Sequence, residues 1–314
     1  MAEYIKLVNT AGLSREEWLC RRREGIGGSD IAAVAGLSPF RGAFDVYTDK
    51  IGLPKPDEEN NAMYWGTVLE PIVAKEFERQ TGKTVRRCNY ILQSTKTPFA
   101  FADVDRMING ENAGLECKTT NAFMVKEWEN DEVPAAYICQ CQWYMYVTGY
   151  EKWYIACLIG GQRFVHSVIE RDGELISLLV EKAADFWENN VLKKVPPSAN
   201  ASSSCCEYIK QRYSTDNGSF VPMTSTIANA AAEVFKTKQR EKELHSYRTG
   251  LENQIKLYMG EAQRGCCEKY ETIWKTQNGP ARLDIEALVK DYNIQDINDY
   301  YTPTTVRKFS VKER

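Results

Sequence analysis

Histidine is scarce in this chain, because its 314 residues contain only His166 and His245. Mechanisms that need a histidine triad or several imidazole ligands therefore have little to work with. No apolar run approaches the roughly 18 residues that would suggest a membrane span, so no contact with a membrane is expected. The N-terminal segment MAEYIKLVNT lacks a basic start followed by an apolar stretch, so it predicts no signal peptide and a location in the cytoplasm.

The cysteines lack a regular spacing, and no Cys-x-x-Cys motif occurs among the ten of them. Two Cys-Cys pairs and one Cys-x-Cys are present, but their spacing matches no zinc pattern. Without an export signal, reduced thiols are the simplest interpretation. We therefore interpret the cysteines as small buried hydrophobic residues rather than as ligands of a metal or an iron–sulfur cluster.

An excess of positive charge is also missing, since 40 Lys and Arg residues face 43 Asp and Glu residues and leave a net charge of −3. This balance argues against a protein coated by nucleic acid, although it allows a local basic patch or channel. Hydrophobic residues make up 43% of the chain and charged residues 26%. These fractions are ordinary for a globular protein with a sizeable core.

One break in composition divides the chain, at the Pro/Ser-rich segment VPPSANASSS over residues 195–204. A single domain holds roughly 100–200 residues. We therefore expect a domain over residues 1–195, a linker over 196–204 and an extension over 205–314. The extension is expected to be largely helical, with one long helix or a helical hairpin over 224–263 and an imperfect apolar stripe along it.

The first domain alternates helical and strand-like segments. Ser14, with Glu17 three positions on, forms a capping box for a helix over 14–22, and Ser29 is a candidate N-cap for the short helix that follows it. The remaining predicted elements are a helix over 68–80, strands over 84–92, 99–108 and 113–119, a helix over 135–148, strands over 152–159 and 163–170, and a helix over 173–192. This order predicts an α/β (α+β) fold with a central mixed sheet flanked by helices.

A candidate metal site lies in the two strands on either side of the turn NGENAG, residues 109–114. Side chains alternate across a strand, so Glu116 and Lys118 project to one face and Cys117 to the other. The turn is rich in hairpin residues, so the strands can pair and bring Asp105 close to Glu116. Two carboxylates and a backbone carbonyl suit a hard cation such as Mg²⁺. A neighbouring lysine can orient a water molecule or help to deprotonate it.

Taken alone, an Asp…Glu-x-Lys pattern usually marks a solvated strand face, but here further motifs stand in order around it. The segments are WLCRR from Trp18, GIGGSD from Gly25, YWGTVLEP from Tyr64, ADVDRM from Ala102, LECK from Leu115 and YICQCQWY from Tyr137. Together they resemble the phage-type recombinases and alkaline exonucleases of the YqaJ and phage lambda exonuclease group, within the PD-(D/E)XK nuclease superfamily. The resemblance covers roughly residues 14–190 and implies a core like that of restriction endonucleases.

The resemblance implies roles for five positions around the metal. Asp105 and Glu116 match the metal-binding carboxylates, with the Cys117 carbonyl as a further ligand, and Lys118 matches the catalytic lysine. Glu70 matches a helix-borne acidic residue near the metal and is an additional candidate ligand. The alternative for Glu70 is a glutamate in the first turn of its helix, where the helix dipole favours it.

The helix over 135–148 carries two further matches. Gln140 and Tyr144 lie four residues apart, hence on one helix face, and match the family's Gln-xxx-Tyr element beside the site. Gln142 is expected to face elsewhere. Asp103 shares a strand face with Asp105, but the family pattern points to Asp105, so Asp103 is expected to be peripheral.

Arg22 and Ser29 match the positions that hold the 5′-terminal phosphate in these exonucleases. The chemistry agrees, because arginine binds phosphate in a bidentate manner and the free N–H groups of a helix start attract anions. The alternatives are a solvated run of three arginines, residues 21–23, and a serine that is only an N-cap.

The resemblance implies a magnesium-dependent deoxyribonuclease, with Mn²⁺ as a candidate substitute, that processively digests one strand of linear duplex DNA from 5′ to 3′ for phage-type recombination. Its implied partners are duplex DNA ends, a single-strand annealing protein and other copies of the chain, up to a trimeric ring. If a phage encodes the chain, the cytoplasm is that of the host cell. Two alternatives stay open: a structure- or sequence-specific endonuclease on the same fold, and a non-catalytic DNA-binding module. The extension is expected to serve assembly or partner docking and to contribute no metal ligand.

Overall fold

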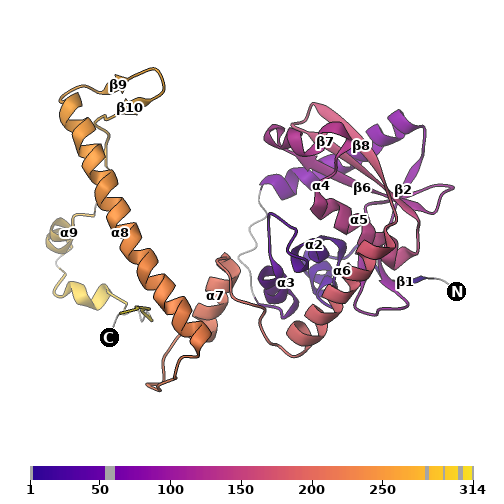
Figure 1. Ribbon diagram of the computed structural model, residues 1–314, viewed down its shortest axis with the longest axis horizontal. Helices are drawn as coiled ribbons and strands as arrows, with labels where there is room; N and C mark the ends of the chain where they lie inside the picture. Colours follow the sequence, from indigo (N-terminus) through magenta and orange to yellow (C-terminus); the bar gives the residue numbers. More distant parts are fainter. Residues whose placement is uncertain (1–2, 54–60, 280–282, 293, 303–306, 313–314) are drawn as a thin grey trace. The chain divides into compact units, whose positions relative to one another are not determined.

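The computed structural model describes residues 3–53, 61–279, 283–292, 294–302 and 307–312. The chain forms two compact units, Met1–Arg212 and Tyr213–Arg314, which are described separately below. The first unit contains two sheets and the helices packed on them, and the second is built around one long helix (Figure 1).

A five-stranded mixed sheet forms the centre of the first unit, in the order β2-β5-β6-β7-β8 (Figure 1). Its strands are β2 (Val85–Arg87), β5 (Arg106–Ile108), β6 (Ala113–Thr120), β7 (Lys152–Ile159) and β8 (Arg163–Glu170). Strands β6 and β7 are parallel, and the other neighbours are antiparallel. A second sheet of three antiparallel strands contains β1 (Tyr4–Asn9), β3 (Tyr90–Ser94) and β4 (Phe101–Asp103). The central mixed sheet expected from the sequence is therefore present.

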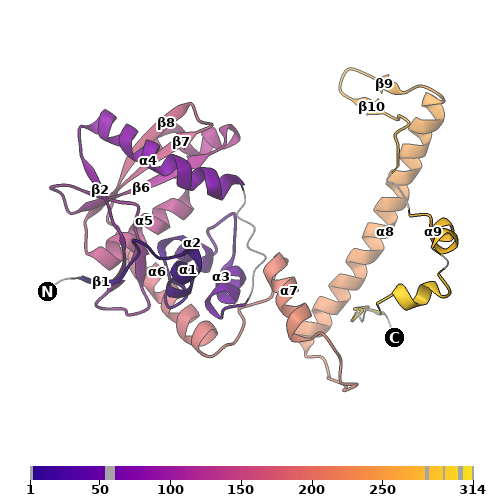
Figure 2. The ribbon, with the colours of Figure 1, turned by 180° about the vertical axis from the view of Figure 1, so that it is seen from behind.

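Helices cover both faces of the central sheet (Figures 1 and 2). On one face, α4 (Asn61–Thr81) buries Val73 and Phe77 against apolar residues of β5, β6 and β7. On the other face, α5 (Ala135–Thr148) packs against α2 (Gly28–Val34) and α6 (Gly173–Asp185) in a larger apolar cluster. The remaining helical segments of this unit are α1 (Arg15–Arg22), α3 (Ala43–Lys50), the 3₁₀ segment η1 (Ala122–Asp131), the π-helical segment η2 (Phe186–Leu192) and α7 (Ser203–Arg212).

Two predicted strands are each divided between the two sheets. The run over 84–92 separates into β2 and β3, and the run over 99–108 separates into β4 and β5. Asp105 consequently lies in the connection between β4 and β5, not within a strand as expected. The predicted hairpin is confirmed, since β5 pairs with β6 in the register Arg106↔Leu115.

Two expectations about helix ends are wrong. Helix α2 begins at Gly28 with Gly27 as its N-cap, so Ser29 is inside the first turn and does not cap the helix. Helix α4 begins by Asn61 rather than near residue 68, so Glu70 lies in its middle and not in its first turn. The helix-dipole explanation of Glu70 therefore does not apply.

Helix α7 places the boundary between the units later than expected. Cys205 on this helix is only 1% exposed, and Ser204 Oγ donates a 2.5 Å hydrogen bond to Asp45 Oδ1 of α3. The ring of Tyr208 packs edge-on against Phe44 and Tyr47 of α3, at centroid distances of 5.5 and 5.9 Å. The first unit thus extends through Arg212, beyond the end of the predicted linker at residue 204.

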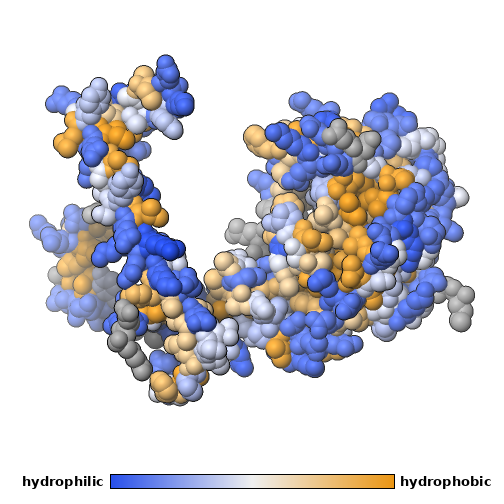
Figure 3. Space-filling model, in the orientation of Figure 1, coloured by the Kyte–Doolittle hydropathy of each residue, from blue (hydrophilic) through white to orange (hydrophobic). Residues whose placement is uncertain are grey.

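The second unit contains the predicted long helix, α8 (Ser225–Met259), capped by Thr224. A hairpin of β9 (Arg264–Cys266) and β10 (Glu271–Ile273) follows α8 (Figure 2), and then come α9 (Ile285–Asp291) and η3 (Ile297–Tyr300). On the face shown in Figure 3, hydrophilic residues cover much of α8. The apolar stripe is largely exposed, with 55% exposure at Ile227 and 67% at Leu244. In the parts of the chain that the structure describes, no helix is long and apolar enough to span a membrane.

Candidate active site

The candidate active site forms where the hairpin β5–β6 meets helix α5. Strand β6 is central, with β5 on one side and β7 on the other, so its residue Glu116 is only 3% exposed. Asp105 enters from the connection that precedes β5, and its Oδ2 accepts a 2.8 Å hydrogen bond from the Cys117 backbone N–H. The hairpin thereby fixes the Asp105 carboxylate beside the strand that carries Glu116 and Lys118.

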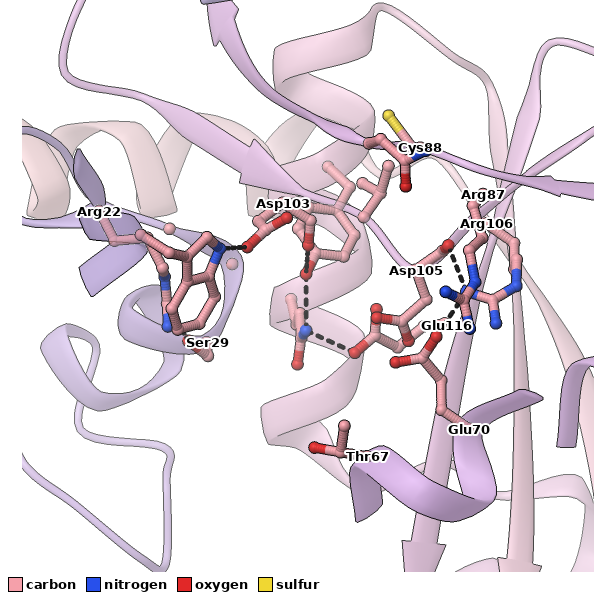
Figure 4. Close-up of a pocket in the computed structure, with 17 residues that line it drawn as sticks. Arg22, Ser29, Thr67, Glu70, Arg87, Cys88, Asp103, Asp105, Arg106 and Glu116 are labelled. Carbon is pink, nitrogen blue, oxygen red and sulfur yellow. Dashed lines mark hydrogen bonds and ion pairs between the residues drawn. The ribbon is translucent and has the colours of Figure 1, made fainter. Parts of the chain in front are cut away.

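A cleft of about 450 Å³ opens over these residues (Figure 4). The predicted site residues that line it are Arg22, Ser29, Glu70, Asp105, Glu116, Gln140 and Tyr144. Lys118 contacts the cleft through Glu116, since its Nζ lies 2.6 Å from Glu116 Oε1. One cavity therefore unites the residues expected for metal binding with those expected for phosphate binding.

The Glu116 carboxylate is incompletely satisfied. Its Oε1 accepts a 2.7 Å hydrogen bond from Gln140 Nε2 and pairs with Lys118. Its Oε2 is buried and has no hydrogen-bond partner among the described residues. A buried carboxylate oxygen without a partner is costly, so this atom marks a position where a cation would be favourable.

Burial and like charges oppose ionisation of the two central carboxyls. Burial raises the pKa of Asp105 well above its usual value, and the charges of Glu116 and Glu70 raise it further. Burial also raises the pKa of Glu116, although Lys118 acts in the opposite direction. For Lys118, burial favours the neutral amine, but Glu116 and Asp105 outweigh it and raise the pKa above the usual value. Lys118 is therefore an ammonium group in this arrangement.

Gln140 and Tyr144 form a hydrogen-bonded chain that holds Glu116. Gln140 Nε2 lies 2.8 Å from the Tyr144 hydroxyl, which donates a 2.9 Å bond to the Asp103 carbonyl. Lys118 Nζ donates to Gln140 Oε1 at 3.1 Å. The same helix approaches α2 so closely that a Cβ on Gly28 would lie 2.5 Å from the Tyr144 ring. As expected, Gln142 faces elsewhere and donates to the Glu170 carbonyl.

Arg106 is a residue of the site that the sequence did not single out. It is 5% exposed, pairs with Glu70 at 2.5 Å and donates a 2.7 Å hydrogen bond to the Asp105 carbonyl. Its position directly after Asp105 in the ADVDRM segment was the available signal. In this arrangement Arg106 balances the charge of Glu70 and connects α4 to the β5 strand.

The residues present fit a hard cation, although they are not gathered around a common point. No group of three or more His, Cys, Asp or Glu side chains in the described part of the chain is placed to hold a metal ion. The Asp105 carboxylate nevertheless accepts a hydrogen bond from Cys117, the residue after Glu116, and Glu116 Oε2 finds no hydrogen-bond partner in the described part of the chain. Carboxylate and carbonyl oxygens are the ligands that Mg²⁺ prefers.

At the other end of the cleft, Arg22 and Ser29 lie in direct contact. Arg22 donates a 2.8 Å hydrogen bond to Ser29 Oγ, and its guanidinium stacks 4.6 Å above the Trp18 ring. Trp18 Nε1 in turn donates to Asp103 Oδ2 at 2.8 Å. Asp103 lines the cleft between the two ends (Figure 4) rather than lying outside it as expected, because β4 ends there and turns its last residue toward Trp18.

The sequence of this chain is similar to those of several known proteins. A model of the YqaJ-like viral recombinase domain matches residues 17–151. A protein of Bacillus subtilis (strain 168), called uncharacterized protein YqaJ, is 41% identical over 311 residues, which cover 98% of this chain and 97% of that protein. Protein D345L of African swine fever virus (strain Badajoz 1971 Vero-adapted) is 32% identical over 73 residues, or 23% of this chain and 21% of that protein.

Solved structures show a similar fold. The alkaline exonuclease LHK-Exo of Laribacter hongkongensis, in its complex with dAMP, aligns with a TM-score of 0.50 and 21% identity. The alignment covers 63% of this chain and 98% of that chain. At this identity the likeness shows the fold alone, which is similar to that of LHK-Exo.

Proposed function

This chain belongs to the family of YqaJ-like viral recombinases, and we propose that it is a metal-dependent nuclease that hydrolyses phosphodiesters of DNA. The observation that carries the proposal is the buried carboxylate of Glu116 and the partly buried one of Asp105, with Lys118 beside them and an arginine–serine pair in the same cleft. The fold shared with an alkaline exonuclease that was solved with dAMP supports a nucleotide ligand.

Asp105, Glu116 and the Cys117 carbonyl would hold the metal, with Glu70 as a further candidate. Bound there, Mg²⁺, or Mn²⁺ in its place, supplies a Lewis acid that stabilises charge on the attacked phosphate and lowers the pKa of water. Lys118, whose Nζ lies 2.6 Å from Glu116 Oε1, orients an attacking water and neutralises negative charge. Gln140 fixes the Glu116 carboxylate through its 2.7 Å hydrogen bond.

Arg22 and Ser29 support recognition of a 5′-terminal phosphate. Guanidinium groups bind phosphate strongly, and Ser29 lies in the first turn of α2, whose free backbone N–H groups attract anions. A terminal phosphate held at this end of the cleft orients the adjoining nucleotide toward Asp105 and Glu116. We therefore propose exonucleolytic digestion of one strand from 5′ to 3′, processively and from the ends of linear duplex DNA, as part of phage-type recombination.

The partners proposed for the chain are duplex DNA ends, a single-strand annealing protein and further copies of the chain, up to a trimeric ring. The exposed apolar stripe on α8, with Leu251 41% and Ile255 43% exposed, supports a role for the second unit in such contacts. We propose that this unit serves assembly or docking and supplies no metal ligand.

One assay tests the proposal and its main rival. Linear duplex with 5′-phosphate ends, the same duplex with 5′-hydroxyl ends, and closed circular duplex are each incubated with Mg²⁺ and with chelator. We expect rapid digestion of the 5′-phosphorylated duplex, slower digestion of the 5′-hydroxyl duplex, and no reaction in chelator. Rapid cleavage of closed circles would favour the endonuclease, and binding of DNA without any cleavage would favour the non-catalytic module.

A further inference from the structure

A buried ion pair lies beneath the end of the cleft that carries Arg22 and Ser29, called the phosphate end below. Asp30 is the third residue of α2, and Lys50 is the last residue of α3. Lys50 Nζ lies 2.7 Å from Asp30 Oδ2, and each side chain is only 1% exposed. Burying two charges is expensive, and hydrophobic residues of the same size often stabilise a fold equally well. Packing alone therefore does not account for a buried ion pair at this position.

Both partners bind the backbone segments that carry the phosphate-binding side chains. Lys50 Nζ donates a 2.9 Å hydrogen bond to the backbone carbonyl of Arg22, at the end of α1, where helix carbonyls lack partners within the helix. Asp30 Oδ2 accepts a 3.1 Å hydrogen bond from the Gly27 N–H, at the start of α2. The pair thus connects the last residue of α1 to the turn that precedes Ser29.

The surrounding charges keep Asp30 ionised. Burial alone would raise the pKa of Asp30, but Lys50, Arg22 and Arg41 outweigh it and hold the pKa well below the usual value. Arg41 NH1 lies 3.3 Å from Asp30 Oδ1, and Lys50 also faces Asp49 at 3.9 Å. Asp30 is consequently ionised at neutral pH and stays a charged partner for Lys50 and Arg41.

We propose that Lys50 and Asp30 are positioning residues that set the distance between Arg22 and Ser29 and so determine the preference for 5′-phosphorylated ends. The proposal rests on the function proposed above. Neither residue lines the cleft, so neither contacts the substrate. Both act through the backbone of the segments that carry Arg22 and Ser29. The side chains of these two residues meet at a distance of 2.8 Å between the Arg22 guanidinium nitrogen and Ser29 Oγ.

The test is the double variant Asp30→Asn/Lys50→Met, measured in the full-length chain. It removes the Asp30 and Lys50 charges together, so that neither is left buried without the other, and the asparagine keeps an oxygen that can accept from the Gly27 N–H or from Arg41. We expect the ratio of kcat/KM on 5′-phosphate ends to that on 5′-hydroxyl ends to fall about tenfold, mainly through KM, the effect of one lost charge-assisted hydrogen bond. The value of kcat/KM on 5′-hydroxyl ends should stay within about twofold of wild type.

A second measurement does not depend on cleavage. In chelator, fluorescence anisotropy compares the affinity of each protein for duplex with 5′-phosphate and with 5′-hydroxyl ends. The double variant should lose the same factor in affinity for the phosphorylated duplex. If it melts below the assay temperature, Lys50→Arg takes its place, because it keeps a cation beside Asp30 but changes the group that binds the Arg22 carbonyl; the expected loss of preference is about threefold or more.

Lys83→Met is the matched control. It removes a lysine that pairs with Glu111 in the same unit, and Lys83 is not among the residues that line the cleft, so the preference should stay unchanged. If the folded Asp30/Lys50 variant keeps the wild-type preference, or if Lys83→Met loses as much, the positioning role is wrong. If wild type itself neither cleaves nor prefers phosphate, the proposed function fails instead.

Discussion

The two ends of the cleft differ in how their charged side chains are arranged: like charges meet at one end, and opposite charges pair at the other. The acidic end, defined by Asp105, Glu116 and Glu70, brings like charges together in a buried place, so the pKa of Asp105 is raised; Glu116 Oε2 there has no hydrogen-bond partner among the described residues. The phosphate end, defined by Arg22, Ser29 and the Asp30–Lys50 pair beneath them, places opposite charges in contact, so the pKa of Asp30 is lowered.

This difference indicates what each end still needs. If the proposed cation binds at the acidic end, it would satisfy these oxygens, and without it the like charges there lower the stability of the fold. The phosphate end already has its internal charges paired and offers the cleft a guanidinium and a hydroxyl. Substitutions that remove charge should therefore affect stability with opposite signs at the two ends, and the following predictions use that contrast.

The largest expected effect is on catalysis at the acidic end. Lys118→Ala should lower the cleavage rate by about a thousandfold or more, because an electrostatic group positioned for the transition state is lost. DNA binding should be kept, since Lys118 contacts Glu116 and Gln140 rather than the open cleft, and the variant should still fold, but less stably because Glu116 loses its partner. Single-turnover cleavage and anisotropy measure the two properties. Lys126→Ala, at an exposed lysine of η1, is the control, and a wild-type rate in Lys118→Ala would refute the assignment.

At the phosphate end, Lys50→Met should lower the free energy of unfolding by about 3–5 kcal/mol, because it leaves the Asp30 charge buried without its partner. Urea unfolding in chelator measures this. The same change at Lys83, whose side chain is 28% exposed beside Glu111, should cost only about 0–1 kcal/mol. Equal losses in the two variants would show that burial of the Asp30–Lys50 pair has no special energetic weight.

Removing charge at the acidic end should have the opposite sign. Asp105→Asn should raise the free energy of unfolding in chelator by about 1 kcal/mol. The reason is that it removes a carboxyl group whose ionisation is opposed by burial and by the charges of Glu116 and Glu70. The same variant should lose the stabilisation that Mg²⁺ gives to wild type.

Glu111→Gln, in the turn between β5 and β6, provides the contrast. Hydrogen bonds from Lys83 and Lys152 lower the pKa of Glu111 to about 2, so its charge is stabilising and its removal should lower stability slightly. Thermal unfolding with and without Mg²⁺ compares the two variants. A destabilised Asp105→Asn variant that still responds to Mg²⁺ would break the comparison between the two ends.

The sequence predicted the long, regular elements well. Strands β7 and β8 have the predicted bounds, and α5 fills its predicted range, because long apolar or alternating runs give a strong periodic signal. The β5–β6 hairpin was also predicted, and with it the approach of Asp105 to Glu116, since the turn between them is rich in Gly and Asn.

The features that the sequence did not reveal depend on tertiary contacts. The bends that divide two predicted strands between sheets occur at Cys88-Asn89 and at Val104-Asp105, where no Gly or Pro interrupts the chain. The ion pair of Asp30 with Lys50 joins two short helices, whose charged residues look like solvent-exposed ones until α2 and α3 pack together.

The packing of helix α7 on α3 is another tertiary contact that the sequence did not reveal. The prediction with the smallest expected effect concerns the part of the chain after this helix. A chain that ends at Arg212 keeps every residue of the cleft. Its Mg²⁺ affinity by calorimetry and its preference for 5′-phosphate should therefore stay within about twofold of the full chain, as expected for a unit with its own core. If the second unit serves assembly, the number of copies per particle, measured by light scattering, should be smaller for the truncated chain.

A chain that ends at residue 200 should differ, because it also lacks α7. That helix covers Phe44 and Tyr47 of α3, and α3 ends at Lys50, which holds the Arg22 carbonyl. Losing this cover should loosen the phosphate end and reduce the preference for 5′-phosphate, while Asp105 and Glu116, held by the β5–β6 hairpin and α5, keep their Mg²⁺ affinity. A folded chain ending at 200 that lost metal affinity but kept the phosphate preference would show that α7 supports the acidic end instead.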